Sequence, residues 1–492
     1  MKRLERAAAP AACYRTRPLP NPLPQAGEGT GNRILFALAT LTLPITATAH
    51  GFGRLYNLPV PFWLYAWGAA CALALSFLLT AYFATSSASR DVGDAGLVHA
   101  QRRVWPGLKA LSVFLLLLCI ATGFFGNRDP YRNFSMTFFW VVFVLGFTYL
   151  TAVIGNFWDA INPWRVMTEA LPGFTNGRLR YPEKLGDWPA LAAYLGFIWF
   201  ELFNHGKPSS LATALLAYTA INFIGAWLVG AAAWFRHCEF FSVYLRLIAL
   251  MAPRSGKSFA GLVQERPESM SAVAFALAML STTAFDGLRE TQWWVGLFWS
   301  DPTGIVTPLV GTRPVLAYAT LRPWYIGWET LWLLASPFVY FGAYLAAIAL
   351  TKRFTRSARS PRELALDFGY TLLPIALVYN ITHYATLILT QGMKIVSLLS
   401  DPFGWGWNLF GTASLLRAPI LPGMGLVWHT QVGLILLGHI VSVYVAHRVA
   451  LRVFPTRRQA LLSQLPMLGL MVTFTVAGLW ILAQPLTAML MR

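Results

Sequence analysis

The chain has 492 residues, of which 56% are hydrophobic, 15% are aromatic and only 12% are charged. Soluble proteins of this size carry about 25% charged residues, so the composition excludes a soluble globular enzyme and predicts a polytopic membrane protein. The formal net charge of +18 would suit nucleic acid, but the basic residues are scattered between apolar runs and form no nucleic-acid motif. We therefore expect the lipid bilayer, and no nucleic acid, as the partner of this chain.

The N-terminal stretch is expected to lie outside the membrane domain. Residues 1–32 are rich in Pro and Gly, which predicts a disordered leader, and the native start could lie downstream of it. Residues 33–49 combine a basic residue, a short apolar core and an A-x-A pattern ending at Ala49, as in a signal peptide. Cleavage there would leave 50–492 as a single transmembrane helical domain that begins with His50. The alternative is an uncleaved leader that lies along the membrane.

Ten apolar segments are candidates to cross a bilayer as helices, the fourth being short and the sixth marginal. They are 61–83, 107–126, 134–154, 189–204, 210–234, 270–286, 326–350, 364–392, 426–446 and 463–484. If the chain begins outside, the loops left in the cytoplasm carry about twice as many Lys and Arg as the outer segments, as the positive-inside rule requires. The predicted fold class is an all-α polytopic membrane protein with about ten transmembrane helices, N-out and C-out after signal cleavage.

Two cytoplasmic stretches are expected to lie in the membrane interface. Residues 155–165 mix tryptophans with Asn and Asp, and residues 234–253 place aromatic and aliphatic side chains on one side and charges elsewhere. Such patterns are typical of amphipathic helices that lie on a membrane.

The segment Asp367–Gly392 carries polar residues in an otherwise apolar helix. At 100° per residue, Asn380, Tyr384 and Gln391 fall within about 40° of one another, with His383 to one side. Unpaired polar groups in hydrocarbon cost several kcal/mol each, so this face must meet protein or a wet cavity.

Other ionisable residues fall at comparable depths. Glu201 and His205 are four residues apart on one helix face, and Asp286 closes the sixth segment. An acid at membrane depth is by default a functional candidate. We expect Glu201, Asp286 and Tyr384 to be catalytic, although a carboxylate at a helix end can equally be an ordinary interface residue.

The histidines suggest a divalent metal, Zn or Cu. His383 and His439 lie within one or two turns of each other in depth, and His205 could join them. If the signal peptide is cleaved, His50 could chelate copper through its ring and its free α-amine. A structural role, with each imidazole satisfied by a hydrogen bond, stays open for every one of these residues.

Several stretches resemble a bacterial family of polytopic membrane proteins that carries the name fenitrothion hydrolase. They are HGFGRLYNLPVPFWLY, GNFWDAINPWR, STTAFDG, HYATLILTQG, LLSDPFGWGWNLFGT, QVGLILLGHIVSVYVAHR and QLPMLGLMVTFTVAGLW. The resemblance covers most of 50–484 and implies a protein of the bacterial inner membrane that hydrolyses a phosphotriester. It supplies no catalytic residues of its own.

Three functions are compatible with these features. The first is metal-assisted hydrolysis of a small-molecule substrate in an outward-facing intramembrane cavity. The second is a transporter or channel for a small solute, which ten spans and midplane polar residues would suit, although the two halves share no sequence similarity. The third is a copper- or metal-handling protein that faces the periplasm.

Overall fold

The computed structural model describes residues 48–49, 56–57, 60–83, 105–204, 206–253, 258–416, 418–420 and 422–484. All of them belong to one unit that spans residues 44–492. This part of the chain is helical except for one short antiparallel pairing of β1 (Thr48–Ala49) with β2 (Tyr56–Asn57). The expected cleavage point after Ala49 therefore lies at the end of β1.

Within the described ranges, nine helical segments are long and apolar enough to cross a membrane, which confirms a multi-pass α-helical architecture. They are α2 (Phe62–Phe83), α3 (Pro106–Phe125), the run α4 (Phe134–Met136), η3 (Thr137–Phe147) and α5 (Thr148–Ile154), α9 (Pro208–Val229), α13 (Met270–Arg289), α16 (Tyr318–Thr355), the run α17 (Pro361–Phe368), η7 (Gly369–Leu372), α18 (Leu373–Gln391), η8 (Gly392–Lys394) and α19 (Ile395–Ser400), α20 (Met424–Val453) and α21 (Arg457–Ala483).

The shorter helices connect or cover these segments. They are η2 (Pro130–Arg132), α6 (Trp158–Ile161), α7 (Pro163–Ala170), η4 (Glu183–Leu185), α8 (Trp188–Asn204), α10 (Ala231–His237), α11 (Phe240–Ile248), η5 (Ala249–Met251), α12 (Ala260–Gln264), α14 (Gln292–Trp299), α15 (Thr307–Val310) and η6 (Pro314–Ala317).

The expected fourth segment is α8, which has only 17 residues. It runs alongside α13 in the same direction. At its start, Asp187 N–H donates to Ser271 Oγ at 2.8 Å, and at its end, the Leu202 carbonyl accepts from Arg289 Nη1 at 3.3 Å. Both helices therefore cover the same depth of the protein.

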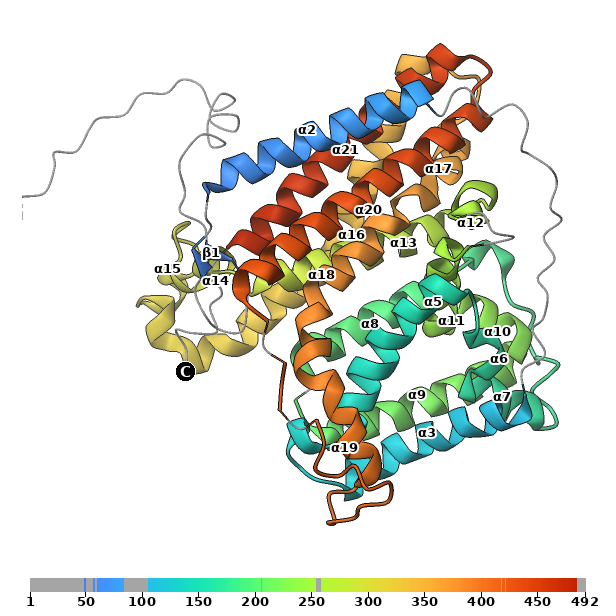
Figure 1. Ribbon diagram of the computed structural model, residues 1–492, viewed down its shortest axis with the longest axis vertical. Helices are drawn as coiled ribbons and strands as arrows, with labels where there is room; N and C mark the ends of the chain where they lie inside the picture. Colours follow the sequence, from blue (N-terminus) through green and yellow to red (C-terminus); the bar gives the residue numbers. More distant parts are fainter. Residues whose placement is uncertain are drawn as a thin grey trace, which may run out of the picture. The chain divides into compact units, whose positions relative to one another are not determined.

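The described helices pack in two bundles (Figure 1). The first contains α3, α9 and the α4–η3–α5 run with α7, α8 and α10, and the second contains α2, α13, α16, α18, α20 and α21. The bundles meet where α8, α11 and η3 pack against α13 and α18. A cavity between these five elements would be lined from both bundles.

Helix α13 lies at the centre of this arrangement, and nearly all of its residues are buried. Its sequence is rich in Ala, Ser and Thr, and small residues let neighbouring helices approach closely in a membrane protein. Ser269 begins the helix by accepting from Ala272 N–H. The element η3, which packs against α18, is an 11-residue π-helix, a wide and rare form that is frequent at functional sites.

The two stretches expected in the membrane interface are instead part of the protein core. Trp158 and Trp164 are only 3% and 2% exposed, and Phe240, Phe241 and Ile248 of α11 are also buried. The aromatic residues stack on one another rather than on lipid, for example Phe143 on Phe241 with ring centroids 4.9 Å apart. The amphipathic pattern was real, but its apolar face packs against helices of both bundles.

The second bundle contains a tandem repeat of a helical hairpin. The first hairpin is α13 with α16, and the second is α18 with α20. In the loops between these helices, Ser300, Asp301, Pro302, Gly304, Leu309, Gly311 and Thr312 recur 100 residues later as Ser400, Asp401, Pro402, Gly404, Leu409, Gly411 and Thr412. The same offset relates Trp328 to Trp428 and Tyr344 to Tyr444 in the second helices.

Two features of the loop backbone repeat as well, although Asp301 and Asp401 themselves differ, with φ of 46° and −139°. The carboxylates of Asp301 and Asp401 each accept N–H bonds from the residues four and five positions later, at 2.8 to 3.0 Å. Gly304 and Gly404 have φ of 67° and 73°, and the later glycine of each loop has φ of 69° and 71°. L side chains rarely adopt positive φ, so glycine is favoured at the same two positions of both loops.

Candidate functional site

The site is built around Asp286, near the end of α13. Its Oδ2 accepts from His383 Nε2–H at 2.8 Å and from the Tyr384 hydroxyl at 2.9 Å, both on α18. The Asp286 and His383 side chains are only 14% and 18% exposed. One carboxylate oxygen of the first hairpin is thus shared by two adjacent residues of the second.

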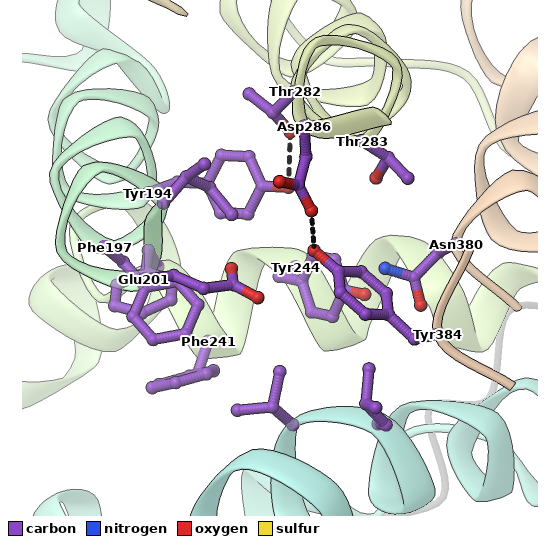
Figure 2. Close-up of a pocket in the computed structure, with 14 residues that line it drawn as sticks. Tyr194, Phe197, Glu201, Phe241, Tyr244, Thr282, Thr283, Asp286, Asn380 and Tyr384 are labelled. Atoms are coloured by element: carbon purple, nitrogen blue, oxygen red, sulfur yellow. Dashed lines mark hydrogen bonds between the residues drawn. The ribbon is translucent and has the colours of Figure 1, made fainter. Parts of the chain in front are cut away.

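Asp286 and Tyr384 line a cavity at the meeting of the two bundles, here called the central cavity (Figure 2). Glu201 reaches into it from α8, opposite Asp286 and Tyr384. Its remaining lining comes from η3, α8, α11, α13 and α18: Val144, Leu145, Tyr194, Phe197, Ile198, Phe240, Phe241, Tyr244, Thr282, Thr283 and Asn380. The volume is about 30 Å³, which is room for one or two water molecules.

The structure brings together Glu201, Asp286, His383 and Tyr384, four of the residues that the sequence singled out. It also places two hydroxyl groups at the site that the sequence did not single out. The Tyr194 and Thr282 hydroxyls lie 3.1 Å apart at the cavity wall. No linear signal marks Tyr194, because a tyrosine in an apolar helix is more often packing than function.

Two larger cavities lie at the two ends of α13. The arginine vestibule, lined among others by Arg165, Arg236, Arg246 and Arg266, includes Ala272 at the start of α13 and has a volume of about 570 Å³. The second, called here the Arg289 pocket, lies at the helix end and has a volume of about 240 Å³. It is lined by Leu202, Phe203, Arg289, Val295, Trp299, Tyr318, Arg322, Tyr325, Ile326 and Glu329.

The three cavities follow one another along α13. Ala272 and Arg289 are separated by about 25 Å at 1.5 Å per residue, close to the thickness of a bilayer core. Helix α11 separates the vestibule from the central cavity, because Leu247 lines the first and Tyr244 lines the second. At the other side, Arg289 stands between Asp286 and the Arg289 pocket.

His439 does not share the central cavity. It is 2% exposed, its Nδ1–H donates to the Ile435 carbonyl at 2.8 Å, and its Nε2 has no partner among the described residues. His205 and His50, the other two expected metal ligands, lie outside the described residues. Within the part of the chain that the structure describes, no group of three His, Cys, Asp or Glu could hold a metal ion. The described residues therefore do not fit a Zn or Cu centre built from three such ligands.

Comparisons of the chain with protein-family models, with curated proteins and with solved structures found no match. Function has to be argued from the site itself.

Proposed function

We propose that the protein is a proton-coupled transporter of a small solute. The observation that carries this proposal is the ionisable cluster of Glu201, Asp286, His383 and Tyr384 around the central cavity. Carboxylates and imidazoles inside a membrane are costly, and such chains form the proton relays of pumps and transporters. In this arrangement Asp286 and Glu201 bind and release the coupled proton. His383 and Tyr384 hold the Asp286 carboxylate in place.

The position of the cluster supports the same function. Asp286 belongs to the first hairpin, and His383 and Tyr384 belong to the second. In transporters built from repeats, substrate and coupling-ion sites lie at the interface between repeats, and movement of one unit against another opens the site to either side. Protonation of Asp286 weakens its bonds across this interface, which couples proton binding to hairpin movement.

We further propose ten crossings in a bacterial inner membrane, with the mature N-terminus and the C-terminus outside. This adds α8 to the nine long segments, on the ground that it runs parallel to α13 over the same depth. The four arginines of the vestibule come from loops that the positive-inside rule assigns to the cytoplasm. The vestibule is then cytoplasmic, and the Arg289 pocket opens outward.

The test is proton movement in proteoliposomes that hold a pH-sensitive dye. Benzoate, choline and glucose serve as an anionic, a cationic and a neutral solute. Wild-type protein should move protons with one of them, and Asp286→Asn should reduce the rate at least tenfold. Glu183→Gln, a change of an exposed carboxylate in the loop before α8, is the matched control. The proposal fails if no solute evokes protein-dependent proton movement or if Asp286→Asn matches wild type.

Hydrolysis of a phosphotriester, which the family resemblance implies, is the second candidate. Two carboxylates flank a cavity that fits a water molecule, and a carboxylate could deprotonate that water for attack on phosphorus. The cavity is far too small for the ester itself, so the two bundles would have to separate to admit it. Release of the phenol from fenitrothion by wild-type protein, lost in Glu201→Gln and in Asp286→Asn, would favour this reaction over transport.

A further inference from the structure

The Arg289 pocket contains a buried ion pair that the proton cluster does not use. Arg289 donates from Nε and Nη2 to the two carboxylate oxygens of Glu329 on α16, each at 3.3 Å. Glu329 is 2% exposed, and the Arg289 side chain is 16% exposed. A single Arg–carboxylate pair with two parallel bonds is therefore almost completely removed from solvent.

This ion pair is longer than a typical Arg–carboxylate pair. Charge-assisted N–H···O bonds are typically about 2.7–2.9 Å, and both contacts here exceed that range. Arg289 also lies 3.6 Å from Glu290 and donates to the Leu202 carbonyl at 3.3 Å, so its guanidinium is divided among three acceptors. A ligand carboxylate that approaches Arg289 at a shorter distance would therefore compete with Glu329 for the guanidinium.

The rest of the pocket suits an anion with an apolar body. Arg322 lines it, is exposed, and forms no ion pair within the described part of the chain. The indole of Trp299 packs against the rings of Tyr318 and Tyr325, with centroids 5.0 and 5.3 Å apart. The pocket thus joins an unpaired positive charge to a wall of three aromatic rings.

We propose that the Arg289 pocket binds a small organic carboxylate with an apolar or aromatic body, which replaces Glu329 on Arg289. The ligand carboxylate lies between Arg289 and Arg322, and its body lies against Trp299 and the two tyrosines. This names the substrate class of the transport proposed above and depends on it for movement across the membrane, whereas the binding step stands by itself.

Proton uptake follows from the exchange of partners. A carboxylate as buried as Glu329 that loses its guanidinium becomes an uncompensated charge, and taking up a proton removes that cost. No bond between heavy atoms changes: one Arg–carboxylate pair is exchanged for another, and one proton from solvent binds the Glu329 carboxylate. The ionisable groups that face Glu329 are Arg289 at the end of α13, Glu290 directly after it, and Arg322, Tyr325 and Tyr318 from α16. Helices α8 and α14 contribute only Leu202, Phe203, Val295 and Trp299.

The experiment measures binding of radiolabelled benzoate to purified protein in detergent between pH 5 and pH 8, with no membrane gradient. Uncharged benzamide is the competitor that lacks the anion. Wild-type protein should bind benzoate at least tenfold more tightly than benzamide, should take up one proton per benzoate, and should lose about tenfold affinity per pH unit where the exchange requires that proton.

Three variants separate the parts of the proposal. Glu329→Gln has the shape of the protonated residue and should bind benzoate at pH 8 as tightly as wild type does at pH 5, with no pH dependence. Glu183→Gln removes an exposed carboxylate outside the pocket and should retain the wild-type pH dependence. Arg322→Gln, a change at an exposed position that leaves the fold intact, should weaken benzoate binding at least tenfold and leave benzamide unaffected.

Binding of benzoate no tighter than benzamide, an unchanged Arg322→Gln variant, or a pH dependence retained in Glu329→Gln would each overturn the proposal. Its failure is distinct from failure of transport. Benzoate binding without proton movement in liposomes rejects the transport function, and proton movement driven by choline or glucose rejects only the carboxylate site.

Discussion

One oxygen of Asp286 accepts both the imidazole N–H of His383, at 2.8 Å, and the hydroxyl of Tyr384, at 2.9 Å. The acceptor lies on the first hairpin of a tandem repeat and the donors on the second. These two hydrogen bonds join the hairpins, which also pack against each other through α13 and α18. If the hairpins move as proposed, protonation of this one oxygen weakens the polar part of their contact.

The first prediction concerns the stability that this contact provides. Asp286→Asn keeps the shape but removes the charge, and we expect the free energy of unfolding to fall by about 1–3 kcal/mol, because a buried hydrogen bond to a charged group is lost. Tyr384→Phe removes a single donor and should cost about 1 kcal/mol. Thermal melting of the purified variants in detergent measures both, and equal melting temperatures for all three proteins would contradict the prediction.

The second prediction concerns the close approach of the two helices of the second hairpin. A Cβ on Gly438 of α20 would lie 2.8 Å from Val378 on α18, whereas a Cβ on Gly433 of the same helix would meet nothing within 4 Å. Gly438→Ala should therefore destabilise the protein by about 1–3 kcal/mol through overpacking. Gly433→Ala is the matched control and should be neutral or up to about 1 kcal/mol more stable, since Ala favours a helix. A Gly438→Ala protein as stable as the control would show that these helices pack less closely.

The third prediction is a pH dependence of the loop after α14. Hydrogen bonds from the Thr307 hydroxyl, and then from the backbone N–H groups of Thr307, Val306 and Ile305, hold the pKa of Asp301 well below its usual range. A carboxyl whose folded pKa is depressed stabilises the folded state above its unfolded pKa of about 3.9, and this contribution is lost as the pH falls further.

The variant Asp301→Asn tests whether the ionised Asp301 carboxylate stabilises the folded state. Its melting temperature should lie below that of wild type at pH 6, and the difference should shrink as the pH is lowered below about 4. A difference that stays constant down to the most acidic pH that the protein tolerates would mean that the charge of Asp301 contributes nothing.

The fourth prediction concerns α8. If this 17-residue helix crosses the membrane, its two ends face opposite sides. In a chain whose native cysteines are replaced, Lys207→Cys should react with a membrane-impermeant maleimide in intact cells, and Lys184→Cys should react only after the cells are lysed. Labelling of both from one side would give nine crossings and place the termini on opposite sides of the membrane.

The sequence by itself determined the membrane class and most of the helices, because twenty apolar residues in a row have no other stable environment. It also singled out candidate site residues, although it placed His439, His205 and His50 among them. Asp286, Glu201, His383 and Tyr384 are conspicuous in apolar helices, since each must find a polar partner there. The recurring Ser-Asp-Pro and Gly pattern of the two loops is also present in the printed sequence, but it relates neighbouring hairpins and not the two halves of the chain.

Only the tertiary structure decided which of these residues meet. The partner of His383 is Asp286, 97 positions away, and no local pattern encodes that contact. His439 was expected at the depth of His383 but bonds to Ile435 and not to Asp286, because depth along a helix does not fix the direction in which a side chain points. The aromatic stretches around Trp164 and Phe241 were expected at the membrane interface, but both residues are buried in the protein. An apolar helix face is stable against lipid and against protein. Which of the two it contacts depends on the neighbours that the rest of the fold supplies.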